Sequence, residues 1–207
     1  MSNLLTHEEY SAIANSLSFP TNAFINGQFQ SSKSGKTFET INPSTGNVIA
    51  KVAACNADDV DHAVIKAREV FDQGHWSKLH PSERKKVLIK FSKLIQRNLN
   101  ELAVMESVDS GKPVRDCATI DLPETIDCLL WHAEAIDKVY DQTAPAGEDA
   151  LSVIVREPVG VVGCVLPWNF PLLMMAWKIA PALATGNSVI VKPAEQTSLT
   201  ALRLAEL

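Results

Sequence analysis

Two valine-rich apolar segments with a helical segment between them constrain the fold more than any other feature of this sequence. Residues 159–166 and 188–191 are predicted as buried strands, because both are apolar and rich in valine. Residues 172–185, which lie between them, are predicted as a helix that ends at Gly186. Connections this short indicate a βαβ unit, with both strands parallel in one sheet.

The loops that follow these two strands are the expected functional region. In open parallel sheets, ligands bind beyond the carboxyl ends of the strands. Those ends lead into residues 167–170, Pro-Trp-Asn-Phe, and residues 192–195, Lys-Pro-Ala-Glu. We therefore expect a binding site where these two loops meet.

The second loop combines a cation with a carboxylate. An acidic residue in this region of a dinucleotide-binding fold hydrogen-bonds a ribose hydroxyl and repels the extra phosphate of NADP, so Glu195 favours NAD. Lys192 could hold the ribose or a phosphate as a flexible point charge. The alternative, which spacing alone favours, makes both residues ordinary solvated side chains. The GxGxxG fingerprint is absent, because Gly160 and Gly163 precede or interrupt the strand.

The first loop carries an amide side chain in a sharp turn. Asn169 lies between Pro167 and Pro171, and an amide fixed there could donate a hydrogen bond to a developing oxyanion. The alternative is an asparagine that only forms the turn. Trp168 could line a ligand cleft and is equally compatible with a place in the core.

No nucleophile can be assigned from the sequence. Cys164 lies in the middle of a predicted buried strand, where nothing nearby in sequence would lower its pKa. Cys55, Cys117 and Cys128 are scattered without a CxxC pair, which predicts reduced thiols and a cytoplasmic protein. The histidines are isolated on polar faces or in loops and are predicted as surface residues: His7, His62, His75, His80 and His132.

Turn and cap signals organise the rest of the chain. After a polar leader, Asn26-Gly27 between short apolar runs predicts a β-hairpin, and a turn at 42–46 separates strands at 38–41 and 48–52. Four helices are predicted next, after Asn56, from Pro81, and over 99–109 and 122–140. Residues 142–147 are a predicted linker, and residues 152–156 alternate like a half-exposed strand.

This pattern divides the chain into three predicted parts of an α/β protein. Residues 1–140 hold the hairpins and helices of the N-terminal part, and residues 141–157 hold the linker and the half-exposed strand. Residues 158–207 form the first βαβα of a parallel-sheet core.

Charge and hydropathy exclude two classes of partner. The net charge of -5, without a cluster of basic residues beyond one helix face, argues against nucleic acid. Residues 158–177 carry no charge, yet their prolines and glycines would break a membrane helix repeatedly, so no membrane partner is expected. The N-terminus has neither a basic start nor an apolar core, so no signal peptide is expected.

Six short motifs together resemble the aldehyde dehydrogenase superfamily, in that family's order and from about Phe24 to Leu207. The motifs are 42–46 (NPSTG), 109–113 (DSGKP), 157–161 (EPVGV), 167–172 (PWNFPL), 186–189 (GNSV) and 192–197 (KPAEQT). The resemblance implies the N-terminal part of the aldehyde dehydrogenase fold: an incomplete Rossmann-like parallel sheet with helices, plus an N-terminal β-hairpin region. It also implies the oxidation of an aldehyde to a carboxylic acid with NAD(P), NADP being the less favoured coenzyme.

The resemblance assigns roles to individual residues. Asn169 would be the oxyanion-hole amide, and the nicotinamide side of the coenzyme would be lined by Leu166, Pro167 and Trp168. Lys192 and Glu195 would bind the adenosine ribose, and the missing glycine fingerprint is no objection in this family. A structural Na⁺ or K⁺ would lie near Ile41, Asp109 and Gln196, with the first and last acting through backbone carbonyls.

The resemblance also suggests a substrate and an assembly. Residues 131–140 look closest to the gamma-glutamyl-gamma-aminobutyraldehyde dehydrogenases of putrescine breakdown, which implies an aminoaldehyde. Residues 141–156 look like the family's oligomerisation hairpin, which implies a homo-oligomer, a dimer or tetramer in the full-length family.

The family's catalytic domain, with its nucleophilic cysteine and general-base glutamate, would lie beyond Leu207. We therefore expect residues 1–207 alone to be inactive. The alternative is a non-catalytic truncated chain, whereas an acyl-phosphate reductase is disfavoured by the Pro-Trp-Asn-Phe-Pro motif.

Overall fold

The predicted βαβ unit is present in the structure, a computed structural model that describes residues 4–207. Strands β7 (Val161–Val165) and β8 (Ser188–Lys192) are parallel, in register from Val161 opposite Ser188 to Val165 opposite Lys192. Helix α7 (Pro171–Ala184) connects them, and α8 (Leu199–Glu206) follows. The expected fold class is therefore confirmed for this part of the chain.

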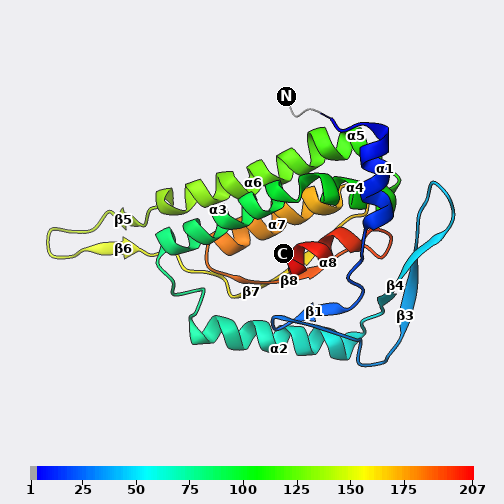
Figure 1. The fold of residues 1–207 in the computed structure, drawn as a ribbon. Coiled ribbons are helices and arrows are strands. Elements are labelled where there is room, and N and C mark those ends of the chain that lie inside the picture. Colours follow the sequence, from blue (N-terminus) through cyan, green and yellow to red (C-terminus); the bar gives the residue numbers. More distant parts are fainter. Residues whose placement is uncertain (1–3) are drawn as a thin grey trace.

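Helices cover both faces of the β7–β8 sheet (Figure 1). Helix α2 (Ala57–Gln73) lies on one face, and on the other α7 packs beside α6 (Leu122–Ala135) and α3 (Pro81–Arg97). Helix α4 (Leu99–Ser110) contacts α8 and the start of the α6 helical run. The main core lies between these helices and the sheet, and it includes Ile95, Leu102, Leu122, Leu129, Leu172 and Ile179.

Local signals predicted the N-terminal hairpins and the first long helix correctly. Strands β1 (Ala23–Ile25) and β2 (Gln28–Gln30) join through Asn26 and Gly27, which both have positive φ, as a two-residue hairpin turn requires. Strands β3 (Thr37–Ile41) and β4 (Val48–Ala53) form the second antiparallel pair. Asn56 caps α2 through a capping box with Asp59.

The polar leader contains a helix that the sequence analysis did not predict. Helix α1 (His7–Ser16) begins after Thr6, whose hydroxyl accepts the amide of Glu9 while the Glu9 carboxylate accepts the amide of Thr6. This capping box is a local sequence signal from which the start of the helix could have been predicted. No residue of α1 is fully buried, so no strong apolar stripe marked the helix.

The prediction of one helix over 122–140 was wrong at both ends. The helical run begins earlier, with α5 (Val114–Asp116) and a π-helical turn at Cys117–Asp121 that continues into α6. Pro123 is typical of the first turn of a helix, so the sequence suggests that a new helix begins here, although the helical run starts earlier. After Ala135 the chain makes a 3₁₀ turn over Ile136–Lys138 and becomes extended at Val139.

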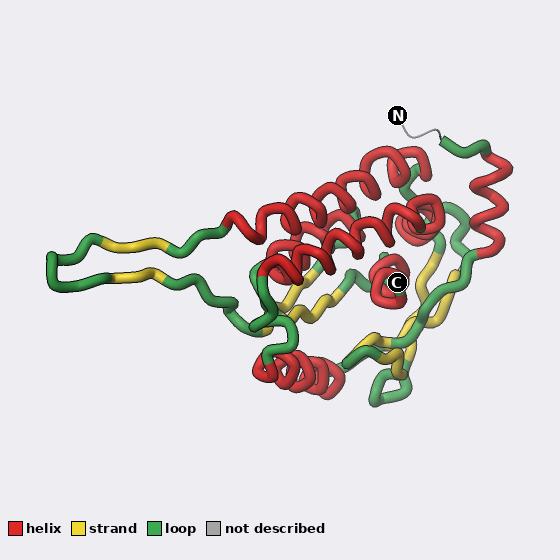
Figure 2. Tube along the Cα trace, turned by 60° about the vertical axis from the view of Figure 1, so that its left-hand side comes forward, coloured by secondary structure: helices red, strands yellow, loops and turns green. Residues whose placement is uncertain are grey.

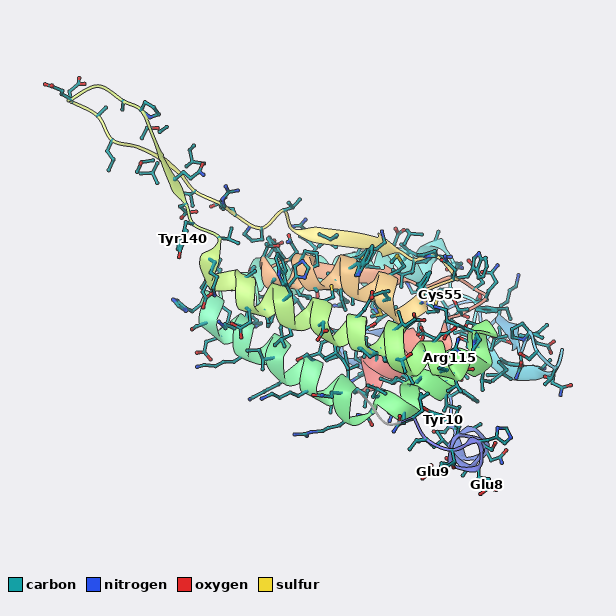
Figure 3. The ribbon with its side chains drawn as sticks, turned by 90° about the horizontal axis from the view of Figure 1, so that it is seen from above. Glu8, Glu9, Tyr10, Cys55, Arg115 and Tyr140 are labelled. Carbon is teal, nitrogen blue, oxygen red and sulfur yellow. The ribbon has the colours of Figure 1, made fainter. Side chains whose placement is uncertain are left out.

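Residues 141–157 form an antiparallel hairpin that extends away from the helices (Figure 2). Strands β5 (Gln142–Ala144) and β6 (Ser152–Ile154) pair from Gln142 with Ile154 to Ala144 with Ser152. Local sequence signals predicted residues 142–147 as a linker, yet they contain strand β5, in agreement with the hairpin that the family resemblance implied. Figure 3 shows Tyr140 where α6 leads into this hairpin.

The uncharged stretch 158–177 comprises β7, a loop and the first half of α7. None of the helices found in residues 4–207 combines the length and the apolar character that crossing a membrane requires.

Candidate functional site

The two loops predicted to form the site lie side by side at the carboxyl ends of β7 and β8. The amide of Leu166 donates to the carbonyl of Lys192 at 3.0 Å, which continues the strand pairing into both loops. The hydroxyl of Thr197 donates to the carbonyl of Trp168 at 3.2 Å. The topology thus brings residues 166–170 and 192–197 together, as parallel strands must.

The first loop presents its polar and aromatic side chains to solvent. Leu166 is buried beneath the loop, whereas Pro167 and Asn169 are exposed and Trp168 is 59% exposed. Trp168 is therefore not a core residue, which removes one of its two predicted readings. A large exposed indole beside an exposed amide offers a flat apolar surface and a hydrogen-bond donor to a ligand.

Lys192 and Glu195 form an ion pair at the end of β8. Lys192 Nζ lies 2.5 Å from Glu195 Oε1, and both side chains are more than half exposed. The hydrogen bond from Lys192 lowers the pKa of Glu195, so its carboxylate is charged at neutral pH. A donor and an acceptor placed side by side can bind two neighbouring hydroxyl groups, as on a ribose.

The residues predicted to hold a cation line one cavity. Ile41, Asp109 and Gln196 lie around a space of about 610 Å³, whose wall also includes Trp168 and Thr197. The cavity joins the β3 strand end to both loops. Carbonyl and carboxylate oxygens, the ligands that hard cations prefer, are available from these residues.

Asp109 is the charged member of this group. It is 2% exposed, and its carboxylate accepts hydrogen bonds from the Thr40 hydroxyl and the Leu199 amide, each at 3.0 Å. Burial raises the pKa of Asp109 to about 6. Among residues 4–207, Asp109 has no cationic partner within ion-pair distance. A monovalent cation would compensate a buried carboxylate of this kind.

A buried polar cluster beneath the first loop was missed by the sequence analysis. Glu106 is fully buried, and its Oε2 accepts the amide of Leu172 at 3.3 Å. Lys112 pairs with buried Asp121, and its Nζ lies 3.6 Å from the ring centre of Phe170. Burial raises the pKa of Glu106 to about 8, and the charge of Asp121 adds to this effect. Helix α4 carries apolar residues around most of its circumference, a signal that Glu106 and Asp109 among them are buried.

The described cysteines have no activated thiol. Cys164 is 2% exposed within β7, and burial raises its pKa, which supports its predicted packing role. Burial raises the pKa of Cys117 to about 12. His80, predicted as a surface residue, is exposed and caps α3 by accepting the amide of Ser82. Within residues 4–207, no three His, Cys, Asp or Glu side chains lie close enough together to hold a metal ion by side chains alone.

Comparison with known proteins finds similarity along the whole length of this chain. The model of the aldehyde dehydrogenase family matches residues 29–207. The chain is 60% identical to the aminoacetaldehyde dehydrogenase of Pseudomonas aeruginosa over 207 residues, which is 100% of this chain and 42% of that protein. The chain therefore spans less than half the length of this curated relative.

Two solved structures share the fold. The gamma-glutamyl-gamma-aminobutyraldehyde dehydrogenase of Burkholderia cenocepacia has a TM-score of 0.96 and 47% identity, over 98% of this chain and 41% of that one. The indole-3-acetaldehyde dehydrogenase complexed with NAD+ has a TM-score of 0.96 and 46% identity, over 98% and 41% of the two chains.

Proposed function

Because this chain belongs to the aldehyde dehydrogenase family, we propose that it is the N-terminal, coenzyme-binding part of an enzyme that oxidises an aldehyde to a carboxylic acid. The observation that carries the proposal is the hydrogen-bonded junction of two exposed loops, 166–170 and 192–197, at the carboxyl ends of parallel strands. This is where parallel sheets bind nucleotide ligands.

We assign NAD⁺ to these loops. The exposed surface of Pro167 and Trp168, above buried Leu166, suits the nicotinamide side, and the Lys192–Glu195 pair suits the adenosine ribose. The charged carboxylate of Glu195 would repel the ribose phosphate of NADP⁺, which favours NAD⁺. Bound coenzyme would accept the hydride released from the substrate.

Asn169 is the proposed oxyanion donor. Its exposed amide lies on the loop beside the coenzyme surface, and a donor held there would stabilise negative charge on the aldehyde oxygen. We also assign Na⁺ or K⁺ to the backbone carbonyls of Ile41 and Gln196 and the carboxylate of Asp109. The support is a buried carboxylate beside a cavity lined by all three residues.

The proposed substrate is a small aminoaldehyde. The support is the 60% identity to an aminoacetaldehyde dehydrogenase and the likeness to a gamma-glutamyl-gamma-aminobutyraldehyde dehydrogenase. We propose further that copies associate through the β5–β6 hairpin, and that the protein works in the cytoplasm, where its free cysteines would stay reduced.

A chain without turnover of its own is the second candidate. The observation that favours it is the state of the thiols, because burial raises the pKa of both Cys117 and Cys164 and neither lies in the loops. This candidate is compatible with coenzyme binding. The two proposals differ only in whether residues 1–207 need a catalytic partner region.

A chimera tests the proposal. Residues 1–207 replace the equivalent part of the P. aeruginosa relative, and NADH production is followed with aminoacetaldehyde. We expect turnover that falls about a hundredfold in Asn169→Ala and none from residues 1–207 alone. A chimera that folds and binds NAD⁺ but oxidises no aldehyde would contradict the enzymatic assignment.

A further inference from the structure

Helix α4 carries two buried carboxylates one turn apart. Glu106 is 0% and Asp109 2% exposed, and residues three apart on a helix lie on neighbouring positions of one face. Neither carboxylate is within ion-pair distance of a basic residue in the described part of the chain. Because no basic side chain forms an ion pair with either acid, the groups that hold each carboxyl in place have to be found among its hydrogen bonds.

Each carboxylate binds the first free amide of a different helix. The Leu172 amide, at the start of α7, donates to Glu106 Oε2 at 3.3 Å, and the Leu199 amide, at the start of α8, donates to Asp109 Oδ2 at 3.0 Å. Pro171 has no amide hydrogen, so Leu172 supplies the first donor of α7. Such amides lack partners within their helix, and a carboxyl oxygen supplies the missing acceptor whether the group is ionised or protonated.

Neither of these helices has a cap from its own sequence. Phe170 occupies the N-cap position of α7, and its side chain has no group that could accept an amide hydrogen bond. Ser198 occupies the N-cap position of α8, yet its hydroxyl makes no capping bond and is buried without a partner. The carboxylates of α4 therefore take the place of the missing local caps.

These two helices directly follow the two loops of the site. Asn169 lies three residues before Leu172, and the Lys192–Glu195 pair lies shortly before Leu199. Lys112, which follows the end of α4 at Gly111, adds a contact with the ring of Phe170. One end of α4 thus contacts both loop-to-helix junctions.

We propose that Glu106 and Asp109 are positioning residues, which cap α7 and α8 from α4 and thereby hold the two loops in a defined relation to each other. That the two loops bind coenzyme rests on the proposed function, whereas the capping of α7 and α8 does not depend on it. A shift in either helix start would move Asn169 relative to Lys192 and Glu195.

The energetic setting supports a positioning role. Burying a carboxylate with few partners destabilises a fold, whereas an apolar side chain of similar size would pack without this cost. The raised pKa of Glu106 reflects such burial. Carboxylates at these positions are therefore better explained by the amides that they hold than by packing.

Amide hydrogen exchange of the chain 1–207, followed residue by residue by NMR, tests the proposal. In Glu106→Leu we expect the Leu172 amide and residues 167–170 to exchange about tenfold faster, relative to core amides of the same variant. Asp109→Leu should do the same at Leu199 and leave Leu172 unchanged. Glu106→Gln and Asp109→Asn keep an acceptor oxygen and should retain most of the protection.

Glu101→Gln is the matched control, because Glu101 also lies on α4 and contacts α8, but through the side chain of Arg203. It should leave both helix starts protected. If the leucine variants fail to fold, Glu106→Ala and Asp109→Ala, which also remove the acceptor, take their place. Protection that falls evenly over the chain, or unchanged exchange at Leu172 and Leu199 in the variants without an acceptor, would overturn the proposal. NAD⁺ binding by the wild-type chain is measured separately, so a failure of the proposed function is distinguishable.

Discussion

A buried hydrogen bond joins Asn187 to Gly160 across the two parallel strands. The Gly160 amide donates to Asn187 Oδ1 at 2.8 Å, and Asn187 Nδ2 donates to the Ala182 carbonyl at 3.0 Å and the Thr185 hydroxyl at 2.9 Å. One side chain thus connects the start of β7, the end of α7 and the start of β8. Asn187 therefore holds together the end of the sheet where both strands begin, which lies opposite the site.

Asn187→Ala should destabilise the chain by about 2–3 kcal/mol, because it leaves the buried Gly160 amide without an acceptor. Urea unfolding followed by circular dichroism measures the loss. Asn47→Ala is the control, since Asn47 is exposed in the β3–β4 turn, and it should change stability by less than about 0.5 kcal/mol. Equal effects of the two substitutions would contradict this role.

Gly160→Ala should also destabilise the chain, by about 1–3 kcal/mol. Gly160 has a φ of +129°, a conformation that residues with a side chain rarely adopt, and an added Cβ would lie 2.8 Å from Arg68 Nη2. Arg68→Ala removes the steric part of the conflict. If the double variant recovers full stability, backbone conformation is not the cause.

The stability of the wild-type chain should fall as the pH rises from about 5 to about 8. The pKa of Glu106 is raised from 4.5 to about 8 by burial, so in this window the native state keeps a proton that the unfolded state has released. Glu106 is faced by Asp121, which raises its pKa, by Lys112, which lowers it, and by the Cys117 thiol.

Glu106→Gln should remove this dependence. Relative to wild type, the variant should gain up to about 1.4 kcal/mol per pH unit through this window. Urea midpoints at pH 6 and pH 8 measure the difference, and Glu101→Gln should retain the wild-type slope. A difference that does not change with pH would mean that Glu106 stays ionised.

Lys192→Ala should weaken NAD⁺ binding about tenfold without altering the unfolding midpoint. The Lys192–Glu195 pair is exposed, and exposed ion pairs contribute little to stability, whereas the ammonium group would donate to the ribose. Titration calorimetry and thermal melts measure the two effects. Lys86→Ala disrupts an equally spaced exposed pair with Glu83 and should leave both quantities unchanged.

Replacing Leu151 and Val153 by serine should weaken self-association at least about tenfold. These side chains of the projecting hairpin are 81% and 52% exposed, so burying their apolar surface against a second copy would favour association. Analytical ultracentrifugation measures the dissociation constant. Val60→Ser on α2, where Val60 is 49% exposed, is the control. An unchanged constant would assign association to another surface.

Local signals account for most of the fold that the sequence predicted. Asn26-Gly27 specified its hairpin because positive φ at two successive positions allows few other turns. Asn56 and Gly111 marked helix ends for similar local reasons. The Thr6–Glu9 capping box was equally readable and was missed, whereas the π-helical turn at Cys117–Asp121 had no signal in sequence spacing.

The candidate site also has a part that the sequence predicted and a part that it could not. The sequence by itself determined which loops meet, because two valine-rich strands and a short helix have only one compact parallel arrangement. It could not determine that Asp109 and Glu106 reach Leu199 and Leu172, since these pairs are 90 and 66 residues apart along the chain.

Tertiary structure alone therefore decided how the loops are held. In a sequence, an acidic residue on a helix usually indicates a face exposed to solvent. Whether the side chain is in fact buried depends on which elements pack against that helix. Here α7 and α8 begin against α4 without caps of their own, so their free amides and the two buried carboxylates become each other's partners. Backbone hydrogen bonds must be satisfied once they are buried, and only the assembled fold decides by which side chain.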